Sequence, residues 1–171
     1  MREIFRYGFI LFLICFFAAS FLAKVYSIAK PRIEQRAKVE FQNTLKQLIP
    51  QGERFLPIKV DDAIVYYKVY TSSDKMVGII FQTQAKGYSS TINTLVAMSP
   101  SFEIIKLKVI DQKETPGLGS RITDKEFVEQ FSKKQIHQIS KLHTITGATV
   151  SSRAVIMAVA EKAKRIEELL K

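Results

Sequence analysis

An uncharged, strongly apolar run near the N-terminus is the feature that most constrains this chain. Residues 7–23 carry no charge and are bracketed by Arg6 and Lys24. As a helix, a run of this length spans roughly 26 Å, which is close to the thickness of a bilayer core. Large apolar residues lie on every side of that helix, which favours contact with lipid over packing on a soluble core. We therefore predict one membrane-spanning helix over 7–23, after a short tail at 1–6.

A cleavable signal peptide is the alternative interpretation, because Ala18, Ala19 and Ser20 lie late in the run. No small-x-small site followed by a sharp polar segment is found, so we expect the run to be retained as an anchor. Basic residues that follow it favour a cytoplasmic C-terminal part by the positive-inside rule, but they equally suit anionic lipid head groups. These residues are Lys24, Lys30, Arg32, Arg36 and Lys38.

Composition limits what the rest of the chain can do. The 171 residues are 47% hydrophobic and 25% charged, which is typical of one folded domain with a small appendage. One cysteine, Cys15, and two histidines make a metal site held by this chain alone improbable, and none is expected. The net charge of +10 is dispersed and lacks interleaved aromatic residues on one face, so nucleic acid is not an expected partner.

Hydrophobic periodicity predicts a helix, then strands, then helices. Apolar residues at helical spacing predict an amphipathic stalk helix over 24–50, which Pro50 ends. Four apolar segments predict paired antiparallel strands, with turn residues between them. These segments lie at about 63–71, 76–83, 92–98 and 102–110.

The last of these strands has the clearest alternation, with Ile105, Leu107 and Val109 on one face. A short helix follows at about 124–131, and a long amphipathic helix over 149–170 closes the chain. The predicted fold class is therefore α+β. A single membrane helix and a stalk helix precede an antiparallel-sheet domain at 51–171 that ends in a long helix.

A stretch of small and hydroxyl residues opens the long C-terminal helix. It consists of Thr146, Gly147, Ala148 and Thr149, and Ser151 follows closely. Free backbone N–H groups and the positive end of the helix dipole at such a position suit an anion. An ordinary N-cap is the alternative interpretation.

A second stretch follows the clearest strand, at residues 114–119. Its glycines permit positive φ and let backbone approach a flat ligand, although it equally suits a tight strand-to-helix connection. Its candidate binding residues are Glu114, Thr115, Gly117, Leu118 and Gly119. Neither stretch offers a Ser-His-Asp set, a carboxylate pair or a P-loop, and no catalytic residue is expected.

Taken together, these features resemble the FMN-binding domain family of the Rnf electron-transport complex G subunit and the sodium-pumping NADH:quinone oxidoreductase C subunit. The membrane helix, stalk, Gly87-Tyr88 element, strand pair, 114–119 stretch and Thr-Gly-Ala-Thr element agree in order over almost the whole chain. The resemblance implies that the Thr149 hydroxyl oxygen carries FMN as a phosphoester, installed by a separate flavin transferase. It also implies that 114–119 lies near the flavin ring, which supplies the electron chemistry.

The function implied by the resemblance is electron relay in an Rnf-type ion-translocating ferredoxin:NAD oxidoreductase complex, a translocase, rather than catalysis by the isolated chain. Its partners would be other membrane subunits of that complex, the flavin transferase and membrane lipid. The protein would be a single-pass protein of the cytoplasmic membrane with its domain on the outer, periplasmic side. A related subunit of the quinone-linked sodium pump, or of another respiratory system, is an alternative.

One position departs from the family pattern. The modification motif usually begins with an aspartate six residues before the acceptor threonine, and His143 stands there. A histidine can form hydrogen bonds but supplies no fixed negative charge. This departure supports a further alternative from a different class, a flavin-free anchored module that binds lipid or a partner subunit.

Overall fold

The computed structural model describes residues 2–60 and 63–170. The chain divides into two compact units, Met1–Thr44 and Leu45–Lys171. The first unit is helical, and the second contains a sheet, the short helices and the C-terminal helix.

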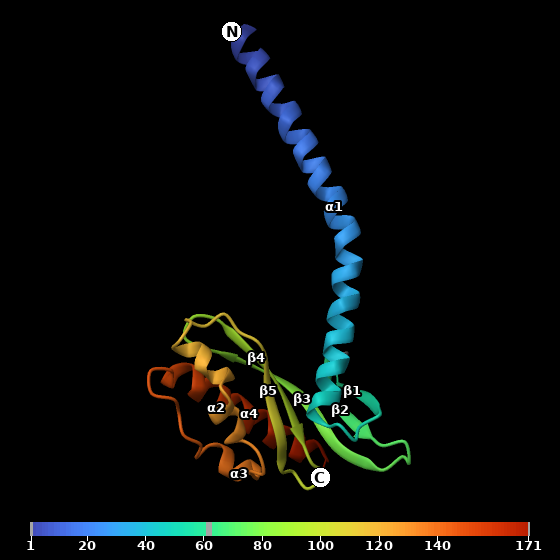
Figure 1. Ribbon diagram of the computed structural model, residues 1–171, viewed down its shortest axis with the longest axis vertical. Helices are drawn as coiled ribbons and strands as arrows, with labels where there is room; N and C mark the ends of the chain where they lie inside the picture. The colour runs from blue at the N-terminus through green and yellow to red at the C-terminus, as the bar shows by residue number, and fades with distance from the viewer. Residues whose placement is uncertain (1, 61–62, 171) are drawn as a thin grey trace. The chain divides into compact units, whose positions relative to one another are not determined.

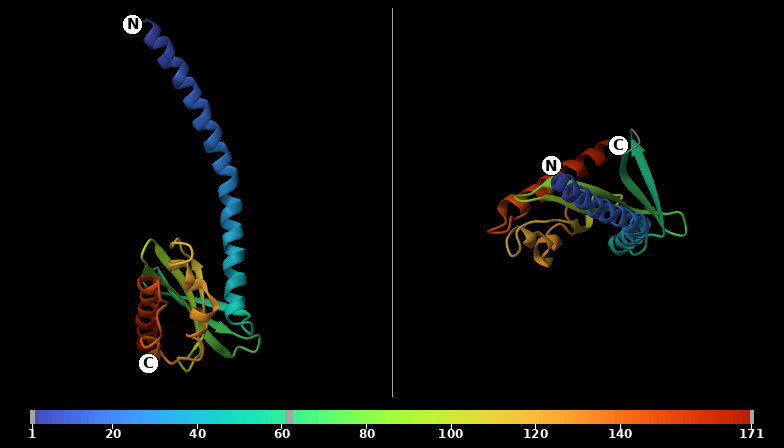
Figure 2. Two further views of the ribbon diagram at one scale, coloured as in Figure 1. Left: turned by 60° about the vertical axis from the view of Figure 1, so that its left-hand side comes forward. Right: turned by 90° about the horizontal axis from the view of Figure 1, so that it is seen from above.

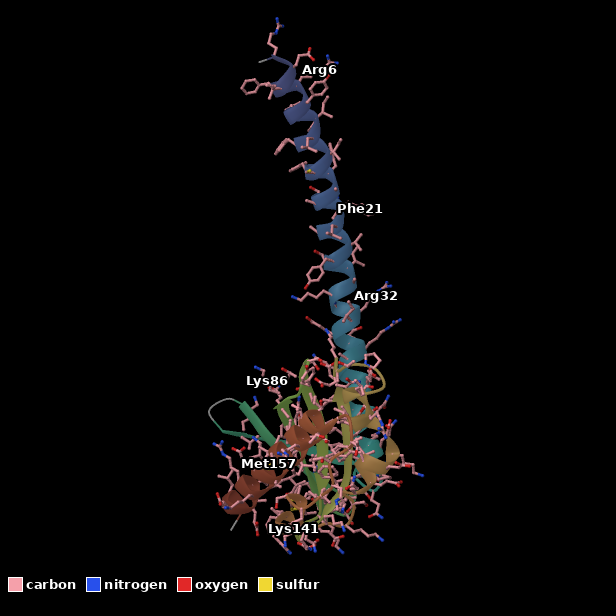
Figure 3. The ribbon with its side chains drawn as sticks, turned by 90° about the vertical axis from the view of Figure 1, so that its left-hand side faces the viewer. Arg6, Phe21, Arg32, Lys86, Lys141 and Met157 are labelled. Carbon is pink, nitrogen blue, oxygen red and sulfur yellow. The ribbon has the colours of Figure 1, made fainter. Side chains whose placement is uncertain are left out.

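Helix α1 extends from Arg2 to Leu48 and includes the predicted membrane span and most of the predicted stalk. Pro31 lies inside it, so one backbone hydrogen bond is lost while the helix continues on both sides. The N-terminal part is long and apolar enough to cross a membrane, and none of its apolar window is buried within the described residues. Figure 3 shows its side chains, with Arg6 and Phe21 labelled, projecting from the helix into open surroundings.

Five antiparallel strands form one sheet, and their order in the sheet is their order in the chain (Figure 1). This arrangement confirms the predicted α+β class. The hydrophobic pattern does not reveal the first strand, because Pro57 and flanking charges interrupt it; an edge strand tolerates proline. The strands are β1 (Arg54–Val60), β2 (Ala63–Tyr70), β3 (Met76–Lys86), β4 (Thr91–Met98) and β5 (Ile104–Asp111).

The main core lies on one face of this sheet, under helix α4 (Thr149–Leu170). The segment with η1 (Gly119–Thr123), α2 (Lys125–Glu129) and α3 (Ile136–Ile139) contributes side chains to the same core (Figures 1 and 2). The bounds of α4 match the predicted long helix. The helix predicted at 124–131 is shorter in the structure, where α2 covers only Lys125–Glu129. Fully buried members of the core include Phe81, Val96, Phe127, Phe131, Ile139, Val155 and Val159.

The opposite face of the sheet is partly covered by the last residues of α1 and the turn after it. Leu45, Leu48 and Ile49 are all buried. A Cβ atom at Gly78 would lie only 2.6 Å from Cδ1 of Ile49, so glycine allows this close approach. Lys108 Nζ donates a hydrogen bond to Gln47 Oε1 over 2.8 Å.

An irregularity in the β4–β5 pairing changes which residue of β5 is buried. Met98 pairs with Ile104 and Ala97 pairs with Lys106, so Ile105 is an extra residue in the ladder. Ile104 is therefore fully buried in the core, whereas Ile105 is 36% exposed. The predicted alternation, which places Ile105 with Leu107 and Val109, is wrong at this residue.

Candidate functional site

A cavity of about 360 Å³ opens where the β3–β4 turn, the segment after β5 and the start of α4 meet. This volume is within the range of small-molecule sites, which is about 300–1,000 Å³. The cavity is lined by Tyr88, Glu114, Thr115, Leu118, Gly119, Gly147, Ala148, Thr149, Val150 and Ser151. Residues distant in sequence are therefore brought together at one end of the sheet.

A tight turn leads into the N-terminus of α4. Gly147 has φ +84°, a conformation that side-chain-bearing residues rarely adopt. The Ala148 N–H donates to the Ile145 carbonyl over 2.9 Å, and the Ser152 N–H donates to the Ala148 carbonyl over 2.9 Å. The Ser152 hydroxyl also accepts a bond from the Ile145 N–H, which fixes the turn to the helix.

The first turn of α4 presents unpaired donors to the cavity. Among the described residues, no acceptor is found for the backbone N–H groups of Thr149, Val150 and Ser151. These groups carry the positive end of the helix dipole, which attracts anions. The exposed Thr149 hydroxyl makes only a long contact, 3.5 Å, with the Ile145 carbonyl. An anion at this end would therefore lie beside a hydroxyl available for modification.

Apolar side chains form the remainder of the cavity wall. Tyr88 is 77% exposed, Val150 is 54% exposed and Leu118 is 51% exposed. Single exposed apolar side chains are common on protein surfaces, but a cluster of them around one cavity is typical of a ligand site. The cavity thus combines an anion-attracting end with a surface suited to a flat apolar ring.

Glu114 lies beneath this cavity with its carboxylate turned into the protein. Its Oε1 accepts hydrogen bonds from the N–H groups of Ser89, over 3.0 Å, and Ser90, over 2.7 Å, and from the Ser90 hydroxyl. Its Oε2 accepts bonds from the Tyr88 N–H, over 3.1 Å, and the Ser151 hydroxyl, over 2.6 Å. Burial raises the pKa of Glu114, but these bonds outweigh it and hold the pKa below its ordinary value.

Eight of the ten residues that the sequence predicts for the site line this cavity. The exceptions are Gly117 and Thr146. Gly117, with φ +74°, occupies a turn whose N–H donates to the Ser120 hydroxyl. Thr146 lines a neighbouring cavity of about 260 Å³, where its carbonyl accepts a bond from Arg121.

Sequence reasoning does not assign Tyr88 and Val150 to the site, nor two of the three serines that donate hydrogen bonds to Glu114. Ser89 and Ser90 lie 24 to 25 residues before Glu114, so only the folded register reveals the contact. The available signal is a glycine, Gly87, followed by an aromatic and two hydroxyl residues in a turn between strands.

His143 lies outside the cavity lining. It is exposed, and its backbone N–H donates to Gln130 Oε1 over 3.0 Å. Across the described residues, no cluster of three or more His, Cys, Asp or Glu side chains is placed to hold a metal ion.

Comparisons with known proteins show what this chain is similar to. The FMN-binding domain family matches residues 87–164. The chain is 32% identical to the G subunit of the ion-translocating oxidoreductase complex of Methanosarcina acetivorans, covering 82% of each protein. It is 28% identical to the G subunit of the proton-translocating ferredoxin:NAD(+) oxidoreductase complex of Clostridium ljungdahlii, covering 89% of this chain and 85% of that relative. The fold is similar to that of NqrC from Shewanella oneidensis, with TM-score 0.50, 20% identity and coverage of 71% and 74%.

Proposed function

Because the chain belongs to the FMN-binding domain family that includes the G subunits of ion-translocating oxidoreductase complexes, we propose that it is a membrane-anchored electron-transfer subunit. In this proposal FMN is bound covalently to Thr149, and the complex is of the Rnf type. The single observation that carries the proposal is the cavity that joins the exposed Thr149 hydroxyl, three free N–H groups and an apolar wall.

The residues of the cavity fit FMN at both ends of the molecule. Free N–H groups of Thr149, Val150 and Ser151 suit the phosphate, since a phosphodiester keeps one negative charge opposite the helix dipole. Tyr88 and Leu118 offer apolar surface to the ring. Among the described residues that line the cavity, no lysine or arginine is available, so backbone dipoles would hold the phosphate.

Thr149 acts in this proposal as a tether and not as a catalyst. Its Oγ1 would lose its proton and bond to the phosphorus of an FMN group supplied as a phosphoanhydride. The P–O bond of the anhydride would break and the second phosphate group would leave, in a reaction carried out by a separate flavin transferase. The weak contact of this hydroxyl leaves it accessible to that enzyme. Covalent attachment would also prevent loss of the cofactor outside the cytoplasm.

Bound FMN would supply the electron-transfer chemistry, which the side chains of the cavity do not provide. The chain's own residues would bind and orient. Leu118 and Tyr88 would exclude water from one side of the ring, while the first turn of α4 fixes the phosphate. The proposed arrangement is an anchor at 7–23, a stalk at 24–50 and the flavin domain at 51–171, on the outer side of the membrane beside other subunits.

The intact mass of the detergent-purified chain, produced together with a flavin transferase, tests the tether. Wild type should gain the mass of FMN less one water, and Thr149→Ala should not. Thr91→Ala, a matched change at an exposed threonine that does not line the cavity, should keep the gain.

An unmodified, colourless wild-type chain would contradict the proposal and favour the flavin-free interaction module. In that case, a His143→Asp variant that regains the added mass would assign the failure to recognition by the transferase.

A further inference from the structure

The carboxylate of Glu114 is the point at which three separate segments of the flavin cavity meet. It accepts bonds from the β3–β4 turn through the N–H groups of Tyr88, Ser89 and Ser90. It accepts another from Ser151 in the first turn of α4. Glu114 itself belongs to the third segment, which follows β5. One side chain therefore connects the parts that carry Tyr88, Leu118 and Thr149.

This carboxylate has no capacity left for a ligand. Its two oxygens offer about four lone-pair directions, and five donors from the protein already occupy them. The residue is only 5% exposed although it lines the cavity. Glu114 is therefore unsuited to be a direct hydrogen-bond partner of the flavin.

Two glycines make room for the carboxylate. A Cβ atom at Gly87 would lie 2.5 Å from Glu114 Oε1, and one at Gly119 would lie 2.6 Å from Oε2. Neither glycine has a positive φ, so close approach rather than backbone conformation accounts for them. The surrounding backbone is thus fitted to this one side chain.

We propose that Glu114 is a positioning residue that joins the Tyr88 wall of the cavity to the Thr149 wall, and so sets the space between them for the flavin. This role rests on the proposed function, because the spacing matters only if a flavin is bound. The hydrogen-bond arrangement itself exists in the flavin-free chain and can be tested there.

The first measurement is amide hydrogen exchange in peptides covering 87–90, in the full flavin-free chain in detergent. Glu114→Gln replaces one acceptor oxygen by an NH₂ group, which leaves backbone donors without a partner. Exchange in these peptides should become roughly tenfold faster or more, given what hydrogen bonds to a charged acceptor contribute. Glu168→Gln, a matched change at an exposed glutamate of α4, should leave exchange unchanged. Unchanged exchange in Glu114→Gln would overturn the proposal.

The second measurement is the visible circular dichroism of the flavin-loaded chain, which reports how rigidly the ring is held. Ser151→Ala cuts only the bond to α4, so 87–90 should stay protected while the flavin signal weakens. Tyr88→Ala should weaken the same signal without loss of stability. A flavin signal unchanged in Ser151→Ala would contradict the joining of the two walls.

These outcomes separate the two claims. Faster exchange in Glu114→Gln together with a wild-type chain that never gains flavin would retain the hydrogen-bond arrangement and reject the proposed function. If Glu114→Gln loosens the whole sheet, the flavin signal of Ser151→Ala decides the proposal alone.

Discussion

At the level of single residues, the site depends on a buried negative charge, the carboxylate of Glu114. In the part of the chain that the structure describes, no lysine, arginine or histidine forms an ion pair with Glu114. Neutral N–H and O–H dipoles stabilise the charge instead, as in the backbone anion sites of other proteins. Its stabilising effect therefore depends on whether the carboxyl group is ionised.

We predict that acid weakens the domain through this group. The pKa of Glu114 lies below its ordinary value of 4.5, so the folded chain binds this proton less tightly than the unfolded chain does. The contribution of the ionised Glu114 to stability is complete when the pH is above the ordinary pKa. It is lost as the pH falls through the lowered pKa of the folded chain. The gap in Tm between wild type and Glu114→Gln should therefore narrow as the pH falls below 4.5 and through the lowered pKa of Glu114. A constant gap would contradict the prediction.

The glycines around the carboxylate give a second prediction. Gly119→Ala places a Cβ atom 2.6 Å from Glu114 Oε2, so we expect a loss of about 1–3 kcal/mol in the free energy of unfolding. Gly117→Asn is the comparison, since a Cβ atom at Gly117 would meet no atom within 4 Å beyond its chain neighbours, and asparagine tolerates its positive φ. Chemical denaturation of both variants checks this difference, and equal losses would argue against the steric explanation.

At the level of helices and strands, the amphipathic pattern predicts the long helices, whereas details of the sheet depend on how the strands pair. The bounds of α4 follow from its apolar stripe and from the turn residues before Thr149. By contrast, α3 (Ile136–Ile139) is too short for a periodic signal. Ile104 is in the core, and Ile105 is not, because the β4–β5 ladder contains an extra residue. Alternation within one strand cannot reveal such a register shift.

That register shift makes a matched pair of substitutions informative. Ile104→Ala removes a fully buried side chain and should cost about 2–5 kcal/mol in the free energy of unfolding. Ile105→Ala removes the same atoms from a partly exposed position and should cost less than half as much. Urea denaturation of the full chain in detergent measures both, and a larger loss at Ile105 would place the irregularity elsewhere.

The same reasoning explains how far the candidate site can be predicted. The sequence gives the order of the 114–119 stretch and the start of α4 along the chain, but it does not show that the two lie side by side in the fold. The contact between Glu114 and Ser151 spans 37 residues, and Tyr88 joins the cavity through a turn between strands. Such contacts depend on the sheet register and on the placement of α4, which no local pattern contains.

Across the chain as a whole, two signals for membrane orientation disagree. Five basic residues closely follow the apolar run and two precede it, which favours a cytoplasmic domain. The proposed function requires the outer side, where a flavin transferase would reach Thr149. We predict the outer side: a C-terminal alkaline phosphatase fusion should be active, and a fluorescent protein that matures only in the cytoplasm should stay dark. The reverse pattern would reject this orientation.

The order of the strands in the sheet also bears on how the domain folds. Each strand pairs with its neighbour in sequence, so the sheet can grow by successive hairpins with little loop-closure cost. The cavity differs, because Glu114 must meet Ser89 and Ser151, which lie 25 and 37 residues away. We therefore expect the cavity to form late, after the sheet, so that a transferase recognising the finished cavity would modify only chains that have completed folding.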